Sequence, residues 1–218
     1  YGSFSRVVRL FGAACALLLP AVFLALVLFS PGAMPMTLLT SVIESRATVP
    51  VGLFGESVLM LLMFNLINEA GQRIPGVMGS SLGLVSALIL GSAAVDAALV
   101  SPLLIIVIAL GGLGSYALPG YPMSFMFRIL QLFLLLVAGL AGLPGLLGAF
   151  VLLTCMAAGT TSLGRPYLAP VSPTRPHNPD IALRAPIFRQ RLRAYLADPA
   201  EMQRSRGRMR RFGKEKKS

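Results

Sequence analysis

Few residues of this chain have the chemistry and spacing of a catalytic or metal-binding site. Its one histidine, His177, lies in a proline-rich segment, and the two cysteines, Cys15 and Cys155, lie far apart within apolar stretches. No nucleophile has a base at useful spacing, and no glycine-rich phosphate loop follows a strand. The pattern predicts no enzyme activity, no cofactor and no bound metal, and both cysteines are expected to be small packing residues.

The residues that stand out are polar groups within or beside apolar sequence. Glu56 has apolar flanks on both sides, and Asn65, Glu69 and Arg73 follow at spacings that favour one stripe of a helix. A charge at the centre of a membrane helix costs at least about 2.5–3.5 kcal/mol, so such residues mark either span ends or polar paths. These four residues and Asp96 are our candidates for pore lining or subunit contact, although for Asp96 a helix end is favoured.

The composition indicates a membrane protein. The 218 residues are 56% hydrophobic and only 12% charged, whereas soluble domains are about 25% charged. Residues 1–164 hold five basic and four acidic groups, and residues 165–218 hold fourteen basic and four acidic groups, so the net charge of +11 belongs almost wholly to the end of the chain. We therefore expect a transmembrane domain over residues 1–163 and a proline-rich, then basic, cytoplasmic tail over residues 164–218.

Four apolar runs suit membrane crossing, which takes about 20 helical residues. They are residues 10–29, 77–95, 102–118 and 129–158. The first run is longer than the apolar core of a signal peptide and is expected to be a retained span. Ser101 and Pro102 provide a helix N-cap and a first-turn proline. Glycines and a proline at 142–145 interrupt the last run, for which one kinked span is preferred over two crossings, with Arg128 near a span end.

Residues 37–73 favour a membrane-associated helix that is interfacial or re-entrant, and a true span with a polar lining is the alternative. The predicted fold class is therefore an all-α integral membrane protein. It has about four transmembrane helices, a re-entrant or interfacial helix and a basic cytoplasmic tail. Small residues recur every four positions in the second run and predict close helix packing, within the chain or between subunits; they are Gly79, Gly83, Ala87 and Gly91.

The distribution of Lys and Arg predicts the orientation. Arg6 and Arg9 precede the first span and the tail is strongly basic, so both termini are expected in the cytoplasm, which requires an even number of crossings. The tail lacks interleaved aromatic residues. Contact with anionic membrane lipids, or a simple topology signal, is therefore favoured over nucleic-acid binding.

A series of segments resembles the A-subunit family of bacterial spore germinant receptors, the GerA-type spore germination proteins. The likeness covers about residues 3–187, the family's membrane domain. The segments are ACALLLPAVFLALVLF (14–29), SRATVPV (45–51), NEAGQRIP (68–75), GSAAVDAALVSP (91–102), GRPYLAP (164–170) and LRAP (183–186). The family has a sizeable cytoplasmic domain before the first span, so the chain is expected to be part of a longer protein. From the resemblance Glu56, Glu69, Arg73 and Asp96 carry over only as polar residues inside matching segments.

The resemblance implies a multi-pass protein of the inner spore membrane that acts in germination. Its implied partners are a transporter-like B-type subunit and a lipoprotein C-type subunit, and nutrient binding leads to ion release. The expected mechanism is an oligomer of like copies that frame a gated ion path, with Glu56 and Glu69 as polar lining. A non-conducting scaffold for receptor partners and a small-solute transporter are the alternatives, although no internal repeat typical of a transporter is evident.

Overall fold

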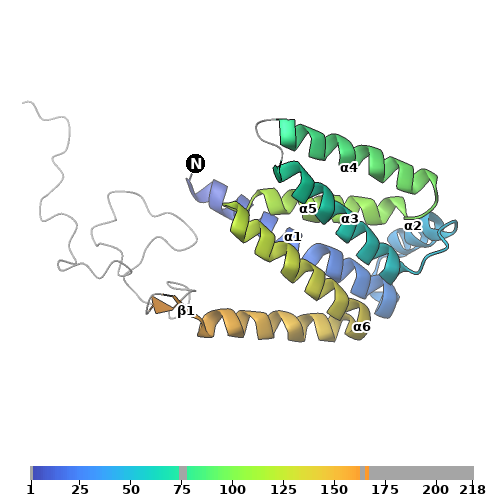
Figure 1. Cartoon of the computed structure of the whole chain (residues 1–218). Helices are drawn as coiled ribbons and strands as arrows, with labels where there is room; N and C mark the ends of the chain where they lie inside the picture. The colour runs from blue at the N-terminus through green and yellow to red at the C-terminus, as the bar shows by residue number, and fades with distance from the viewer. Residues whose placement is uncertain (1, 74–77, 163–164, 167–218) are drawn as a thin grey trace, which may run out of the picture. The chain divides into compact units, whose positions relative to one another are not determined.

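The computed structural model describes residues 2–73, 78–162 and 165–166, and most of the predicted tail lies outside these ranges. Two compact units divide the chain, one of Val8–Thr154 and one of Tyr1–Val7 with Cys155–Ser218. The helices, shown in Figure 1, are α1 (Gly2–Phe29), the 3-10 turn η1 (Pro31–Ala33), α2 (Met36–Arg46), α3 (Leu53–Arg73), α4 (Met78–Asp96), α5 (Pro102–Tyr116) and α6 (Tyr121–Gly159). After α6, β1 (Thr161–Ser162) pairs antiparallel with β2 (Arg165–Pro166).

The helices have the length and apolar character of membrane spans, which confirms the all-α integral membrane class. Three stretches of the described chain are long and apolar enough to cross a membrane, namely Ser3–Phe29, Leu53–Gly71 and Pro122–Gly159. The segment 37–73, expected to hold one interfacial or re-entrant helix, forms two helices, α2 and the 21-residue α3. A break at Ala47–Gly52 separates them, so α3 begins as a helix of its own.

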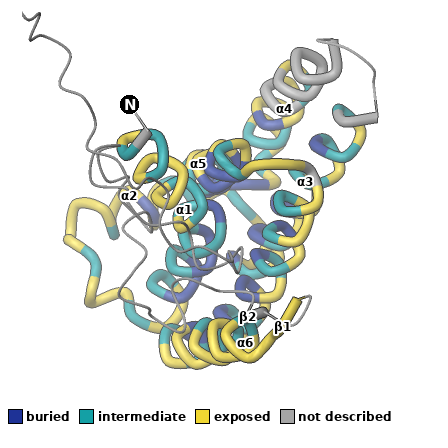
Figure 2. The backbone as a smooth tube through the Cα atoms, turned by 90° about the vertical axis from the view of Figure 1, so that its left-hand side faces the viewer, coloured by how far each residue is buried: buried dark blue, intermediate teal, exposed yellow. Residues whose placement is uncertain are grey.

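Three apolar clusters hold the larger unit together. Ala21 and Ala25 of α1 pack against Leu134, Ala138 and Leu146 of α6. A second cluster joins α1, α3 and α6; its buried members are Leu24, Leu53, Leu61 and Leu135. A third cluster joins α3 to the start of α5; its buried members are Met60, Val100, Leu104 and Ile108. Figure 2 shows buried residues on the facing sides of these helices and exposed residues on their outer sides.

The outer sides of the helices are themselves apolar. Leu140, Leu113 and Ile89 are each at least 60% exposed, and Leu66 is 65% exposed on α3. A soluble monomer rarely exposes apolar surface on this scale. These outer faces suit contact with lipid tails, in agreement with the membrane class.

Helix α6 reverses direction at Gly142. This residue has φ 65° and ψ −155°, which lies in a backbone region open essentially only to glycine. A Cβ placed on Gly145 would lie 3.5 Å from Cγ1 of Val137, although eight residues of straight helix would span about 12 Å. The two halves therefore run back along each other (Figure 1), and the interruption expected from the sequence is a reversal and not a bend within one straight run.

Contacts along the helices give their relative directions. Gly12 of α1 meets Gly114 of α5 while Pro20 meets Gly111, so these two helices are antiparallel. The ring of Phe64 in α3 meets Gly112 of α5, and farther along both chains Asn68 meets Tyr116, so α3 and α5 are parallel.

The first half of α6 is antiparallel to α5. Ser124 lies beside Ser115, and Gln131 lies beside Gly111. Near the other end of α1, a Cβ on Gly142 would come within 2.9 Å of the ring of Phe29. Helix α1 and the first half of α6 therefore run in one direction, and α3 and α5 run in the opposite direction.

Candidate functional site

Glu56 is a buried carboxylate near the start of α3. Only 1% of the residue is exposed. Its Oε1 accepts two hydrogen bonds from Ser101, one from the backbone N–H at 2.5 Å and one from the hydroxyl at 2.6 Å. Hydrogen bonds to a charged acceptor contribute about 1.5–3 kcal/mol each, so Glu56 ties α3 to the start of α5.

Ser101 occupies the N-cap position of α5, as the sequence predicts, and Pro102 follows in the first turn. Its hydroxyl, however, makes no capping bond to its own helix and donates to Glu56 instead. The Glu56 carboxylate therefore replaces the capping bond that Ser101 would otherwise make within α5. The negative charge of Glu56 also lies beside the positive N-terminal end of the α5 dipole, which stabilises that charge.

Arg46, at the end of α2, provides the opposite charge. Its Nε lies 3.5 Å from Oε2 of Glu56 without forming a hydrogen bond. The Arg46 side chain is 26% exposed, whereas the Glu56 side chain is fully buried. The Glu56 clamp, defined here as Glu56 with Arg46 and Ser101, thus joins three helices at one end of the larger unit.

The turn between α4 and α5 sets the position of Ser101. The N–H groups of Ala98 and Leu99 bond to the carbonyls of Val95 and Ala94 at 2.8 and 2.9 Å, a Schellman ending in which Ala98 takes φ 53°. This left-handed conformation is usual for glycine and is strained for alanine. The neighbouring Val100 is buried in the third apolar cluster and anchors the turn over α3.

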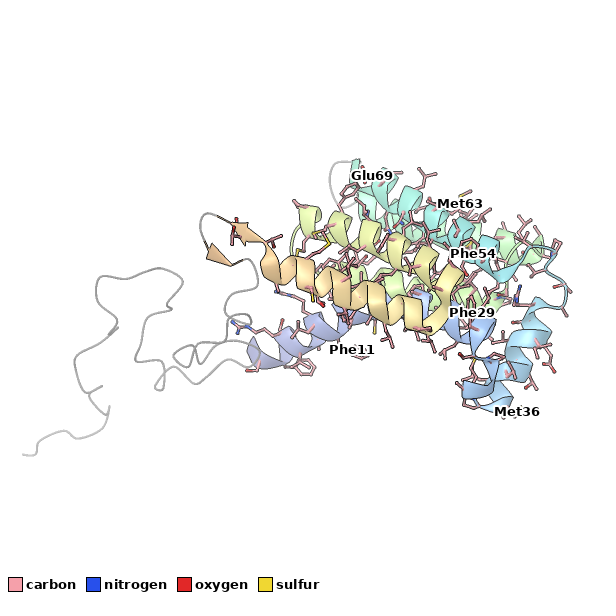
Figure 3. The ribbon with its side chains drawn as sticks, turned by 90° about the horizontal axis from the view of Figure 1, so that it is seen from below. Phe11, Phe29, Met36, Phe54, Met63 and Glu69 are labelled. Atoms are coloured by element: carbon pink, nitrogen blue, oxygen red, sulfur yellow. The ribbon has the colours of Figure 1, made fainter. Side chains whose placement is uncertain are left out.

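A second polar contact joins α3 and α5 farther along. The hydroxyl of Tyr116 donates to Oδ1 of Asn68 at 2.5 Å, and Asn68 is only 6% exposed. Asn68 lies twelve residues after Glu56, or about 18 Å along the helix. Figure 3 shows the separation through Phe54, beside the clamp end of α3, and Glu69, near its other end.

The remaining polar candidates differ in placement. Asn65 is half-buried on α3, and its Oδ1 has no hydrogen-bond partner in the described chain. Glu69 is half-buried one turn later, whereas Asp96 is exposed as the last residue of α4. Arg73 ends α3, and its side chain lies outside the described parts. Arg128, expected near a span end, is only 7% exposed and lies within the helix packing.

The predicted small-residue ridge lies on α4, and its side-chain surroundings are described only at Gly91. There a Cβ would be 3.9 Å from Ile105 of α5, an ordinary packing distance. A closer approach of two helix backbones lies between α1 and α5: Gly114 of α5 approaches the backbone of Gly12, and its Cβ position is 3.0 Å from the backbone nitrogen of Ala16. The signal for this contact in the sequence is the four-residue spacing of Gly12 and Ala16.

The described residues contain no group of three or more His, Cys, Asp or Glu side chains that could hold a metal ion. Cys15 is half-buried on α1, as expected of a packing residue, whereas Cys155 is exposed on α6. With one carboxylate oxygen occupied by two donors and the other facing an arginine, the Glu56 clamp is suited to fix helices together. Breaking it would remove the polar contacts that join the end of α2 and the start of α5 to α3.

This arrangement defines a class: a helical membrane domain whose buried polar contacts connect its helices. The chain matches the Bacillus/Clostridium GerA spore germination protein family over residues 1–196. Spore germination protein GerLA of Bacillus cereus is 38% identical over 172 residues, 79% of this chain and 35% of that protein. Spore germination protein XA of Bacillus anthracis is 34% identical over 173 residues, 79% and 35% of the two chains. Spore germination protein GerQA of Bacillus cereus is 32% identical over 213 residues, 94% and 43% of the two chains.

The chain therefore belongs to the GerA spore germination protein family, which confirms the resemblance drawn from its segments. It spans about a third of the length of the first of these relatives. No solved structure matches it.

Proposed function

We propose that this chain is the membrane part of an A-type subunit of a spore germinant receptor. In this proposal like copies assemble in the inner spore membrane, conduct or release ions, and work with B-type and C-type receptor subunits and with membrane lipids. The observation that carries the proposal is the family match over residues 1–196 on a helical chain with membrane-spanning character.

The polar residues of α3 support an ion path beside this helix. Buried or half-buried polar groups within apolar membrane helices are costly and commonly mark ion or substrate pathways. Asn65 and Glu69 are the proposed lining residues, because they are half-buried and not enclosed as Glu56 is. Gly79, Gly83, Ala87 and Gly91 remain a proposed packing face of α4 towards other helices or subunits.

In the proposed mechanism the Glu56 clamp controls the path. The clamp holds the start of α5 and the end of α2 against α3. Its release would let α3 shift and would expose its polar stripe to ions. Glu56 then acts through helix position, and Asp96 and Arg73 are proposed as polar groups at helix ends.

Helix directions support a membrane topology with six crossings. With α1 entering from the cytoplasm, α3 returns, α4 goes out, α5 returns, and the two halves of α6 go out and back. The four-span arrangement expected from the sequence also leaves both termini cytoplasmic. Six crossings are favoured here because α3 is long enough to span and α6 reverses at Gly142.

The proposal is tested by ion flux from liposomes that contain the purified full-length protein. Glu56→Gln keeps the shape of the side chain but removes the charge that faces Arg46, so we expect flux to change by roughly fivefold or more. The matched control is Glu44→Gln, which neutralises an exposed carboxylate on α2 and should leave flux as it was.

No flux from a correctly assembled wild-type protein would contradict conduction and favour the scaffold alternative. Flux that responds equally to both substitutions would instead contradict control by the Glu56 clamp, because a general change in surface charge would explain it.

A further inference from the structure

Helix α2 lies at one end of the larger unit, between two helices of membrane-spanning length. Helix α1 ends at Phe29 and α3 begins at Leu53, and because these two helices run in opposite directions, both of these ends lie on the same side. The 11 residues of α2 extend only about 16 Å, which is too short to cross a membrane. Helix α2 is therefore expected to lie at the membrane surface.

The exposure of its side chains divides α2 into three sides. One side faces the protein: Val42 is 2% exposed, and Leu39 and Arg46 share its side at helical spacing. A second side carries Met36 and Ile43, which are 77% and 62% exposed and lie about two helical turns apart. The third side is polar and exposed, and its members are Thr37, Ser41 and Glu44.

The second side suits lipid, whereas the third suits water. Exposed apolar side chains such as Met36 and Ile43 gain free energy when they leave water. Thr40 lies between the two sides, and its hydroxyl donates to the carbonyl of Thr37 at 2.9 Å, so lipid contact there leaves no free hydroxyl proton. Leu38, which is 44% exposed, borders the side that faces the protein. A helix with separate apolar and polar sides commonly lies in the plane of the membrane surface.

Lipid fits this surface better than a second protein chain does. Leu28 and Phe29, at the end of α1, are also exposed, so the apolar surface continues along the chain into a membrane-spanning helix. A stable protein interface buries about 800 Å² on each partner and involves about 20–30 residues, far more than Met36 and Ile43 offer. In Figure 3 Met36 lies at the edge of the larger unit.

The side of α2 that faces the protein reaches the Glu56 clamp. Arg46 follows Ile43 by one helical turn, and its Nε lies 3.5 Å from Oε2 of Glu56 without a hydrogen bond. The strength of such an ion pair depends on the distance between the charges, and no directional bond fixes that distance here. The position of α2 at the membrane surface therefore affects how closely Arg46 approaches Glu56.

We propose that α2 binds the membrane surface with Met36 and Ile43 among the lipid chains, and that this contact holds Arg46 against Glu56. The partner is the phospholipid bilayer, through the upper part of its hydrocarbon chains. The Glu56 clamp thereby responds to the lipid around the protein. The proposal rests neither on ion conduction nor on the number of crossings.

The first test measures the depth of α2 in phosphatidylcholine and phosphatidylglycerol vesicles that contain the full-length protein. Ile43→Cys or its matched control Glu44→Cys carries a fluorescent label, and all other cysteines are replaced. The apolar side of a surface helix lies about 5–10 Å into the boundary between headgroups and chains, so lipid brominated on the upper chain should quench position 43 at least about twofold more than position 44. Iodide in the water should show the opposite order.

Equal quenching of the two positions would overturn the proposal, because α2 would then have no lipid side. Position 43 shielded from both quenchers would also overturn it, because a second protein chain would then cover this side.

The second test asks whether the lipid contact acts on the clamp. Ile43→Ser should lower the Tm of the full-length protein in lipid nanodiscs, and this shift should be roughly halved in a Glu56→Gln background, where the ion pair is already lost. Arg46→Gln provides the same background if Glu56→Gln fails to fold. The control is Ile89→Ser, at a similarly exposed residue of α4, whose shift should be the same in each background. An Ile43→Ser shift that is also unchanged would overturn the link to the clamp.

Discussion

At the scale of single residues, Glu56 replaces the usual capping interaction of a helix with a contact between helices. A serine at an N-cap commonly bonds to its own helix, but both donors of Ser101 point to the carboxylate of α3. The contact satisfies two polar groups inside an apolar unit. Its loss would leave Glu56 buried with Arg46 as its only partner at ion-pair distance in the described chain.

Ser101→Ala should therefore weaken the protein. The substitution removes the hydroxyl donor but keeps the backbone N–H, so we expect the unfolding free energy to fall by about 1.5–3 kcal/mol. The measurement is an unfolding titration in mixed micelles with a denaturing detergent. Ser92→Ala is the control, because Ser92 is exposed and its hydroxyl donates to the carbonyl of Ile89 in its own helix. Equal effects of the two substitutions would contradict the role of Ser101.

The sequence predicted part of this site. Apolar flanks singled out Glu56 as a candidate for pore lining or subunit contact, and the Ser-Pro pair placed the start of α5 correctly. The partnership between them was not predictable, because Ser101 lies 45 residues away and no periodicity connects the two positions. The burial of Arg128 was also not predicted, because apolar flanks suit a span end and a helix interface equally well.

At the scale of elements, Gly142 divides α6 into two helical halves. The sequence showed the interruption at 142–145 but not the reversal, which depends on contacts with α1. Ala138 before the turn and Leu146 after it pack in one cluster with Ala21, so α1 holds the two halves together. Proline at 144 alone would permit a kink within one span, and it is the backbone of Gly142 that makes the reversal possible.

Gly142→Ala should destabilise this turn. The residue has a φ of 65°, and a Cβ would lie 2.9 Å from the ring of Phe29, so we expect a loss of about 1–3 kcal/mol in unfolding free energy. Gly148→Ala, in the second half of α6, is the control: a Cβ there meets nothing within 4 Å, and the substitution should stabilise the helix by up to about 1 kcal/mol. If Gly142→Ala behaved like its control in the same titration, the reversal would be refuted.

At the scale of the whole molecule, composition predicted the membrane class, the resemblance of several segments indicated the family, and the number of crossings was left open. A polar stripe lowers the hydropathy of α3, and the apolar part of α6 is a single uncharged run, so the sequence did not separate the crossings that we now propose for these helices. Our account has six alternating crossings. In this proposed topology the Glu56 clamp would lie near the outer side of the membrane, and Asn68 and Arg128 would lie toward the cytoplasmic side.

The topology is tested most directly by labelling single cysteines in intact cells with a maleimide that does not cross membranes. The full-length protein would carry Cys15→Ala and Cys155→Ala, with Leu99→Cys or Pro119→Cys added. Six crossings predict labelling at position 99, between α4 and α5, and none at position 119, between α5 and α6. The control Ala33→Cys lies outside in both arrangements and should always react. Labelling at 119 but not at 99 would support four crossings and contradict the account.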